Sequence, residues 1–181
     1  MKSSIRLFVA ATLPENLKEK LQEQLQRFHH PNLRMIPAQN LHLTLYFIGN
    51  VPHEKLAEIK QVLQETAKRH QSFTLYHEQT EAGPNKKKPR LIWARFSAHT
   101  AFEELTQDLT QQLSTDSSSP KKPIPHITLA RFRKDKPAPK DLPAVQFDHP
   151  VILTVDTISL WHSELASPHP VYSVLETYPL G

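Results

Sequence analysis

LHLTLYFI at residues 41–48 and PHITLARF at residues 125–132 share one pattern, a His-x-Thr-Leu motif carried on a short apolar run. The chain contains 11 His, 13 Thr and 23 Leu in 181 residues, so two chance copies of this four-residue pattern are not expected. Both runs alternate in the way that predicts a half-buried β-strand. We therefore treat the repeated motif as the feature that organises the fold.

Strand geometry separates the polar and apolar residues of each motif. Successive side chains of a strand point to opposite faces. His42 and Thr44 thus share one face, with the leucines on the other, and His126 and Thr128 are arranged in the same way. The leucines are expected to enter the core. Each imidazole and hydroxyl pair is then left on the opposite face, and an approximate two-fold relation would bring the two pairs together across a cleft.

The residues around the motifs also repeat. Thr12 and Thr100 each begin a capping-box sequence with glutamate three residues later, which predicts a helix start. Apolar, strand-like runs at 5–10 and 91–96 precede them. Leucines follow both threonines at the same helical offsets, at Leu17, Leu21, Leu25, Leu105, Leu109 and Leu113. We predict one domain over residues 1–181, with an internal duplication of roughly 1–80 and 90–181.

The remaining elements follow from periodicity and turn residues. The first predicted helix runs to about Phe28. The pattern further predicts a helix over 53–69, strands near 73–77, 152–161 and 171–177, and loops over 83–90 and 114–123.

Composition excludes several kinds of site. The three glycines, at 49, 83 and 181, cannot form a dinucleotide-binding or P-loop fingerprint. Without cysteine there is no thiolate nucleophile, disulfide framework or cysteine-held zinc or iron–sulfur centre. The formal charge of +4 favours an anionic partner only weakly. No apolar run approaches a membrane span, and residues 7–13 are interpreted as a first strand, so a cytoplasmic protein is expected.

Two histidines across a cleft suit in-line displacement at phosphorus without a metal. A neutral imidazole can take a proton from water while a protonated one gives its proton to the departing oxygen. The ordinary imidazole pKa lets both forms exist near neutrality. Thr44 and Thr128 can hydrogen-bond the non-bridging phosphate oxygens.

These residues resemble the paired motifs of the 2H phosphoesterase superfamily, and most closely its RNA 2′,3′-cyclic phosphodiesterase branch, formerly called 2′-5′ RNA ligase. The resemblance covers nearly the whole chain. Besides 42–47 and 126–131 it includes Arg6-Leu7-Phe8-Val9-Ala10, residues 89–93, and the closing 171–175 with Pro179-Leu180.

The resemblance implies an α+β, bilobal fold. Two pseudo-symmetric lobes with antiparallel sheets and outer helices would surround a central cleft. It also implies metal-independent hydrolysis of a ribose 2′,3′-cyclic phosphate to a 2′-phosphate, with His42 as proton donor and His126 as proton acceptor. Family members also join RNA ends reversibly through a 2′-5′ bond. No cofactor is expected, the partners are RNA ends or cyclic-phosphate nucleotides, and the protein is expected to act as a monomer away from membranes.

Two further site residues depend on their position in the motifs. Arg131 corresponds to the family's phosphate-contacting arginine, and Phe47 stands at the equivalent place in the first motif. Strict alternation gives Arg131 the parity of Leu129, so it must lie at the strand end or beyond a β-bulge to reach the cleft. Tyr46 shares the parity of His42 and is a candidate for stacking on a base, whereas Trp93 is expected in the core.

Other features have simpler interpretations. The run Lys86-Lys87-Lys88 could follow an RNA backbone but is more typical of a solvated turn. The family often has glycine before the final strand tyrosine, whereas this chain has ASPHPVY at 166–172, so access to the cleft is expected to differ there.

Three alternatives remain open from the sequence. The enzyme could act on a small nucleotide such as an ADP-ribose cyclic phosphate. His42 and His126 could instead be ligands of a zinc or manganese hydrolase, although neither motif has a carboxylate nearby. In the third alternative the cleft is a non-catalytic RNA-binding module.

Overall fold

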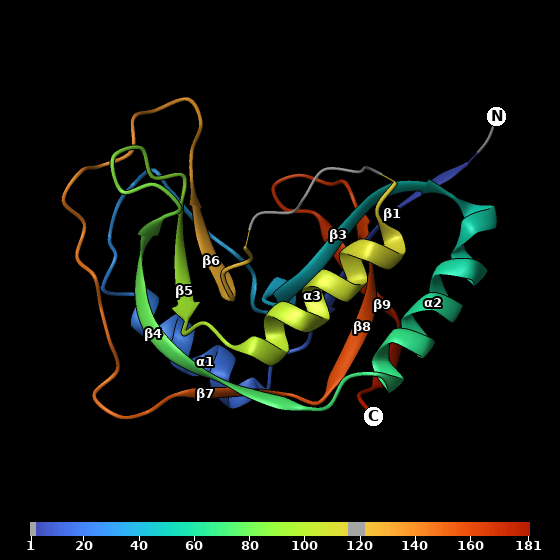
Figure 1. The fold of residues 1–181 in the computed structure, drawn as a ribbon. Coiled ribbons are helices and arrows are strands. Elements are labelled where there is room, and N and C mark those ends of the chain that lie inside the picture. The colour runs from blue at the N-terminus through green and yellow to red at the C-terminus, as the bar shows by residue number, and fades with distance from the viewer. Residues whose placement is uncertain (1–2, 116–121) are drawn as a thin grey trace.

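The computed structural model describes residues 3–115 and 122–181 and has an α+β fold (Figure 1). The strands are β1 (Ser4–Ala11), β2 (Leu33–Met35), β3 (Leu43–Pro52), β4 (Phe73–Gly83), β5 (Leu91–Phe96), β6 (His126–Phe132), β7 (Ile152–Val155), β8 (Thr157–Glu164) and β9 (Val171–Pro179). The helices are α1 (Glu15–Leu25), α2 (Leu56–Lys68) and α3 (Thr100–Leu113), with short 3₁₀ turns at Ala38–Asn40 and His53–Lys55. Much of the predicted loop 114–123 lies outside the described residues.

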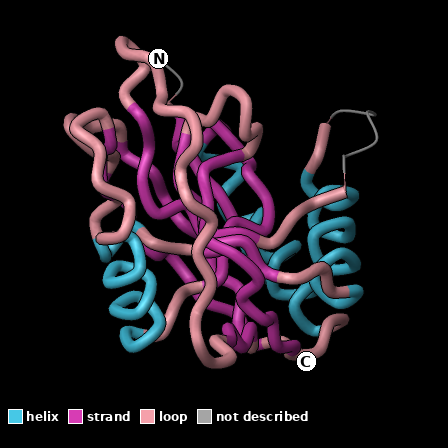
Figure 2. The backbone as a smooth tube through the Cα atoms, turned by 90° about the vertical axis from the view of Figure 1, so that its left-hand side faces the viewer, coloured by secondary structure: helices cyan, strands magenta, loops and turns pink. Residues whose placement is uncertain are grey.

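The strands form two antiparallel sheets, with orders β3-β1-β8-β9 and β2-β6-β5-β4-β7. β3 begins at Leu43, directly after His42 of the first His-x-Thr motif, in one sheet, and β6 carries the whole second motif in the other. Strands occupy the middle of the molecule and helices lie on its two flanks (Figure 2). The expected α+β class with two antiparallel sheets is thereby confirmed.

The two halves of the sequence exchange elements between the sheets. β4 comes from the first half but pairs with β5, while β8 and β9 come from the second half and extend the sheet of β1 and β3. Helix α1 packs under the sheet of β4 to β6, and α3 packs against β3 (Figure 1). The predicted segments 1–80 and 90–181 therefore do not map one to each sheet. The duplication itself stays a prediction.

The helix starts differ from the predicted capping boxes. α1 begins at Glu15 after Pro14, whose carbonyl accepts hydrogen bonds from Leu17 and Lys18, and no side chain caps it. Thr12 lies too far back along the segment that leaves β1. α3 is capped by His99, whose Nδ1 accepts the Ala101 N–H at 3.0 Å. Thr100 is already the first residue of α3, so it cannot act as the cap.

The leucine periodicity is nevertheless confirmed. The leucines of α1 are buried, as are Leu105 and Leu109 of α3, while Leu113 packs at the core's edge. α1 ends at Leu25, with Phe28 in the turn that follows, donating its N–H to the Leu25 carbonyl. The predicted helix over 53–69 is a 3₁₀ turn followed by α2.

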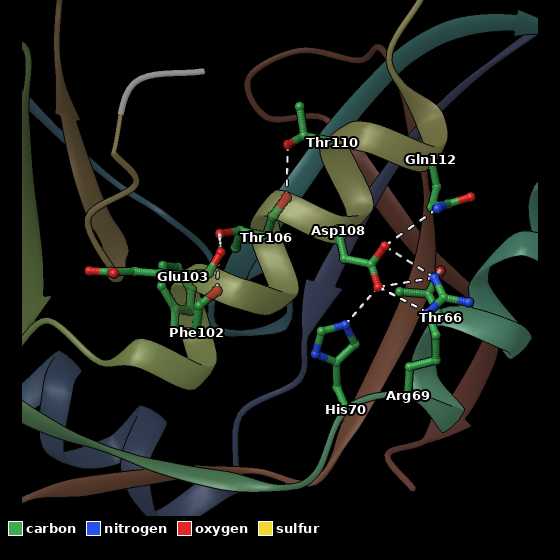
Figure 3. Close-up of polar contacts among 9 residues, drawn as sticks. All are labelled: Thr66, Arg69, His70, Phe102, Glu103, Thr106, Asp108, Thr110 and Gln112. Carbon is green, nitrogen blue, oxygen red and sulfur yellow. Dashed lines mark hydrogen bonds and ion pairs between the residues drawn. The ribbon is translucent and has the colours of Figure 1, made fainter. Parts of the chain in front are cut away.

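An ionic cluster joins the end of α2 to the middle of α3. The guanidinium of Arg69 donates to both carboxylate oxygens of Asp108 at 3.0–3.2 Å, and His70 Nε2 lies 2.7 Å from Asp108 Oδ2 (Figure 3). Burial alone would raise the pKa of Asp108, but the hydrogen bonds from His70 and Arg69 outweigh it and lower that pKa. The cluster fixes both helices on the flank of the β3 sheet.

In the described parts of the chain, none of the helices combines the length and apolar character needed to cross a membrane.

Candidate active site

Strand alternation divides the motifs as predicted. Leu43 and Ile127 are fully buried, as is the neighbouring Leu41, whereas His42 and His126 are only partly buried. In each strand the apolar side chains anchor the polypeptide in the core, which fixes the opposite face in space. Packing therefore positions Thr44 and Thr128 within their strands, whereas His42 directly precedes β3 and His126 is the first residue of β6.

Both polar pairs face one cavity of about 630 Å³. His42, Thr44, His126, Thr128 and Arg131 all line it, so the structure brings together five of the six predicted site residues. The other residues that line it are Arg6, Phe8, Arg34, Ile36, Asn40, Phe47, Phe132, Arg133, Lys134, Asp135, Pro168, His169, Pro170 and Tyr172.

A β-bulge brings Arg131 to the cavity. In the pairing of β5 with β6, Trp93 lies opposite Thr128 and Ile92 opposite Ala130, so Leu129 is an extra residue. An extra residue reverses the alternation beyond it. Arg131 consequently reaches the same side as His126, which confirms the expectation that a bulge or strand end was required.

A bulge at Leu45 has the opposite consequence for Tyr46. Thr44 pairs with Ala10 and Tyr46 with Val9, so Leu45 is the extra residue. Tyr46 turns toward the core, packs against it and does not line the cavity, which corrects the placement expected for a base-stacking residue. Phe47 lines the cavity in its place, with half of its side chain exposed.

His42 is oriented by hydrogen bonds on both ring nitrogens. Its Nδ1 donates to the Asn40 carbonyl at 2.7 Å, and its Nε2 lies 3.0 Å from Thr44 Oγ1. A carbonyl only accepts, so Nδ1 carries the hydrogen and the neutral ring accepts the Thr44 hydroxyl at Nε2. Phe8 and Trp161 pack beside the ring, with centroid separations of 4.9 and 5.4 Å.

His126 is held in the same way at Nδ1. Its Nδ1 donates to the Ile124 carbonyl at 2.7 Å, again two residues earlier in the chain. Trp93 packs against the imidazole at a centroid separation of 4.8 Å. Gly83 makes room for this indole, because a Cβ there would come within 2.8 Å of it. Trp93 is a buried residue, as expected, and it also shapes the site.

Burial lowers the pKa of both imidazoles. For His42 the lowering is opposed by the Asn40 carbonyl and increased by the charges of His126 and Arg131. For His126 it is opposed by the Ile124 carbonyl and increased by Arg131. A charge on His126 thus adds to the lowering of the His42 pKa that burial begins.

The cavity is strongly cationic, and sequence reasoning missed most of the cations. Arg6, Arg34, Arg133 and Lys134 line it together with Arg131, and among the residues that the structure describes Asp135 is the one carboxylate that lines it. Asp135 is itself paired with Arg133 at 3.3 Å. Parity along the first strand could have indicated Arg6, which lies two residues before Phe8. The others depend on pairing between segments that the sequence does not reveal.

Two of these cations lie directly opposite each other. Arg34 of β2 and Arg131 of β6 are cross-strand partners, and within the described residues neither forms an ion pair. Like charges at such positions repel. A bound anion would relieve the repulsion, so this corner of the cavity is suited to a phosphate group.

Other sequence candidates lie elsewhere. Lys86 pairs with Glu81 at 3.5 Å, and none of the lysines at 86–88 lines the cavity, consistent with a solvated turn. Pro168, His169 and Pro170 do line the cavity, so the segment that departs from the family pattern forms part of its rim. Within residues 3–115 and 122–181, no cluster of three or more His, Cys, Asp or Glu side chains could hold a metal ion.

The fold and cavity define a protein in which two equivalent His-x-Thr motifs face one cationic cavity. The model of the 2′-5′ RNA ligase superfamily matches residues 13–166, and the chain belongs to this family. The resemblance inferred from the two motifs is thus confirmed.

Two relatives of this chain have the same name. The RNA 2′,3′-cyclic phosphodiesterase of Thermus thermophilus is 32% identical, over 97% of this chain and 90% of that protein. The one from Methanothermobacter thermautotrophicus is 26% identical, over 97% and 99%.

Solved structures agree with the fold. The crystal structure of TT0787 of Thermus thermophilus superposes with a TM-score of 0.83 at 32% identity, covering 97% of this chain and 98% of that one. The structure of E. coli LigT complexed with 3′-AMP gives a TM-score of 0.78 at 27% identity, covering 98% and 99%.

Proposed function

We propose that this protein hydrolyses RNA 2′,3′-cyclic phosphate ends to 2′-phosphates, using His42 and His126 as a general acid and base. The observation that carries the proposal is the matched pair of histidines. Each is held by an Nδ1 bond to the carbonyl two residues earlier, and each faces the same cationic cavity. The activity named for the relatives at 26–32% identity supports it.

The reaction is a displacement in line with the bond that breaks. His126 takes a proton from water as the water oxygen bonds to phosphorus. The bond from phosphorus to the ribose 3′ oxygen breaks, and His42 gives that oxygen a proton. The phosphate stays on the 2′ oxygen. These roles follow the family assignment, and the Nδ1 bonds leave Nε2 of each ring as the atom that exchanges protons.

The other polar residues stabilise charge on the phosphate. Thr44 and Thr128 are placed to donate to its non-bridging oxygens, and Arg131 supplies a charge-assisted donor. In the free protein Thr44 is bonded to His42, so an incoming phosphate oxygen replaces His42 as the acceptor for that hydroxyl. All of these residues come from one chain, and the site is complete in a monomer.

Chemistry by imidazole, hydroxyl and guanidinium needs no metal. The Asp135 carboxylate in the cavity is paired with Arg133, and arginine and lysine side chains line the cavity beside the imidazoles. This positive charge opposes the binding of a metal cation. We therefore propose that hydrolysis is independent of metal.

Reversible ligation uses the same geometry. If a 5′ hydroxyl of a second RNA end takes the place of water, the displacement joins the two ends through a 2′-5′ bond. His126 would take the proton of that hydroxyl, and His42 would again protonate the 3′ oxygen.

The direct test is hydrolysis of an oligoribonucleotide ending in a 2′,3′-cyclic phosphate in the presence of EDTA. We expect turnover in EDTA and a 2′-phosphate product. His42→Ala and His126→Ala should each lower kcat by about 10²–10⁴-fold. His53→Ala, at an exposed histidine outside the cavity, is the control. A 3′-phosphate product, loss of activity in EDTA, or near wild-type rates in both site variants would contradict the proposal.

A further inference from the structure

One buried polar side chain of the cavity has no part in the proposed reaction. Asn40 lines the cavity at the end of a 3₁₀ turn, and the residue is only 5% exposed. It lies two residues before His42 and outside the repeated motif. Burying an amide side chain costs free energy unless the amide is hydrogen-bonded, so the contacts of Asn40 indicate what the residue does.

Two hydrogen bonds of Asn40 lead to different parts of the site. Its backbone carbonyl accepts the Nδ1 hydrogen of His42 at 2.7 Å. Its side-chain Nδ2 donates to the carbonyl of Pro170 at 3.0 Å, 130 residues further along the chain. Pro170 belongs to the segment 168–170, which lines the cavity directly before β9. Asn40 therefore ties the imidazole of His42 to a distant segment of the cavity rim.

The connection returns to His42 through Tyr172. Tyr172 lies on β9, two residues after Pro170, and packs edge-to-face with the imidazole of His42 at a centroid separation of 5.6 Å. The hydrogen bond at Pro170 thus also fixes the chain that carries this ring. Asn40 supports the imidazole twice, by its carbonyl at Nδ1 and by its side chain through the start of β9.

The second motif lacks the side-chain part of this support. His126 donates from Nδ1 to the carbonyl of Ile124, but the side chain of Ile124 is apolar and the residue is 49% exposed. An isoleucine side chain has no donor or acceptor with which to hold a neighbouring segment. The backbone thus holds both imidazoles alike, whereas the residue that provides the carbonyl has a side-chain anchor for His42 and none for His126.

We propose that Asn40 is a positioning residue for the proton donor His42, which it holds in the Nδ1–H tautomer and in a fixed relation to the rim segment 168–170. The proposal rests on the proposed function and deepens it. A ring that keeps its Nδ1 hydrogen exchanges protons at Nε2, so the tautomer decides which atom meets the substrate. Misplacing a catalytic group by about 1 Å can cost about 10²-fold in rate, which gives the anchor its value.

The carbonyl of Asn40 also favours the form of His42 that a proton donor needs. Burial lowers the pKa of His42, and the hydrogen bond to the Asn40 carbonyl opposes that lowering. The charges of His126 and Arg131 add to the lowering. A protonated ring gains more from the carbonyl than a neutral ring does, because charge-assisted hydrogen bonds are the stronger ones. The bond keeps this strength while the carbonyl stays in line with Nδ1, and the anchor at Pro170 keeps it there.

The tautomer of His42 tests the proposal without turnover. Nitrogen-15 NMR of the imidazole rings at about pH 8, where histidines are neutral, distinguishes the two tautomers, and comparison with His42→Ala assigns the signals of His42. The wild type should show the Nδ1–H tautomer alone. Asn40→Leu keeps nearly the same side-chain volume without a donor, and the hydroxyl of Asn40→Ser ends one bond short of the amide nitrogen. Both variants should give a mixture of tautomers at His42.

His126 provides an internal reference in the same spectra. Its carbonyl partner is Ile124, so its tautomer should be the same in the wild type and in both Asn40 variants. Asn85→Ala removes an exposed side chain that accepts the Lys87 N–H in a turn outside the cavity, and it should change neither histidine. The proposal is overturned if His42 keeps a single tautomer in both variants, or if His126 changes as much as His42, which is the result that unfolding or a purely structural role would give.

Kinetics separate this proposal from the proposed function. With adenosine 2′,3′-cyclic phosphate, Asn40→Leu and Asn40→Ser should lower kcat about 10–100-fold and leave KM unchanged, because the groups that bind the phosphate stay in place. Hydrolysis by the wild type with near wild-type kcat in both variants would overturn the positioning role and leave the proposed function standing. A wild type that hydrolyses no cyclic phosphate, while the tautomer of His42 depends on Asn40, would support the positioning of His42 and overturn the proposed function.

Discussion

Leu45 and Leu129 occupy the same place in the two halves of the site: each is the extra residue of a β-bulge, directly after the threonine of its motif. Each bulge reverses the alternation of side chains at the point where the strand passes the cavity. The residue two places further along, Phe47 or Arg131, therefore faces the cavity instead of the core. The two motifs thus share a bulge as well as their polar residues, and the duplication itself stays a prediction.

The bulge at Leu129 makes Arg131 a residue whose charge can be tested directly. Arg131→Gln keeps a polar side chain but removes the guanidinium. We expect kcat/KM for a cyclic-phosphate substrate to fall about 10–100-fold, the loss of a charge-assisted hydrogen bond of roughly 1.5–3 kcal/mol. Arg90→Gln changes an exposed arginine outside the cavity and should have no effect. An equal loss in both variants would mean that general electrostatic attraction, and not contact at Arg131, is responsible.

The pH dependence of kcat/KM follows from the lowered pKa values of His42 and His126. For the free enzyme, kcat/KM needs one ring neutral and one protonated. The plot of kcat/KM against pH should therefore be bell-shaped. Its acidic and basic limbs should both lie below the ordinary imidazole pKa of about 6.5, and activity should fall as the pH rises above that value. Arg131→Gln removes a charge that lowers both pKa values, so its profile should move to higher pH. A profile centred above pH 7 for the wild type would contradict the assignment.

The sequence predicted the parts of the site that depend on alternation alone. His42, Thr44, His126 and Thr128 needed only the period of a strand, and the need for a bulge before Arg131 followed from its parity. The matching bulge at Leu45 leaves no mark in the sequence, so Tyr46 was expected in the cavity where Phe47 lies.

Other features depended on contacts between distant segments. Arg34 reaches the site because β2 pairs with β6, which no local pattern indicates. The pairing of β4 with β5 in the sheet that contains β6 likewise cannot be seen in any local pattern. The capping sequences at Thr12 and Thr100 failed for a local reason: Pro14 and His99 stand at the actual helix starts.

The cluster on Asp108 should contribute measurably to stability. Asp108→Asn removes the negative charge of the group that accepts hydrogen bonds from Arg69 and His70, but keeps the size of the side chain. We expect the free energy of unfolding at pH 7 to fall by about 1–3 kcal/mol, because partly buried donors lose a charged acceptor. Urea unfolding measures this, with Glu104→Gln on the exposed face of α3 as the matched control.

The contribution of Asp108 to stability should also depend on pH. Since the pKa of Asp108 is lowered in the folded protein, this contribution should be present above the pKa of the carboxylate in the unfolded chain and disappear as the pH falls through its pKa in the folded protein. Equal stability of the two variants at pH 7 would mean that solvent screening cancels the ion pairs.

His77, outside the proposed site, should make the fold sensitive to acid. Burial, with a smaller effect of the Arg95 charge, lowers its pKa to about 4. Its Nε2 lies 2.8 Å from the Thr80 hydroxyl, which in turn donates to the side-chain oxygen of Gln24 on α1. The neutral ring is thus a donor in a network that joins α1 to β4, and a second proton would place an unpaired charge there.

The sign of the pH effect follows from that lowered pKa. The unfolded chain protonates His77 near pH 6.5, before the folded protein does, so stability is fully present above that pH and is lost as the pH falls toward 4. Allowing for solvent at the ring, the loss in the free energy of unfolding should be about 1–2 kcal/mol.

The variant His77→Gln tests this. It keeps an N–H donor for Thr80 and cannot be protonated, so its free energy of unfolding should depend less on pH between 6.5 and 4. The other buried histidines contribute equally to both proteins and cancel in the comparison. Urea unfolding at pH 7.0, 5.5 and 4.5 provides the measurement, with His53→Gln as the exposed control. If His77→Gln and the wild type lose stability in parallel over this range, His77 is not the source of the acid sensitivity.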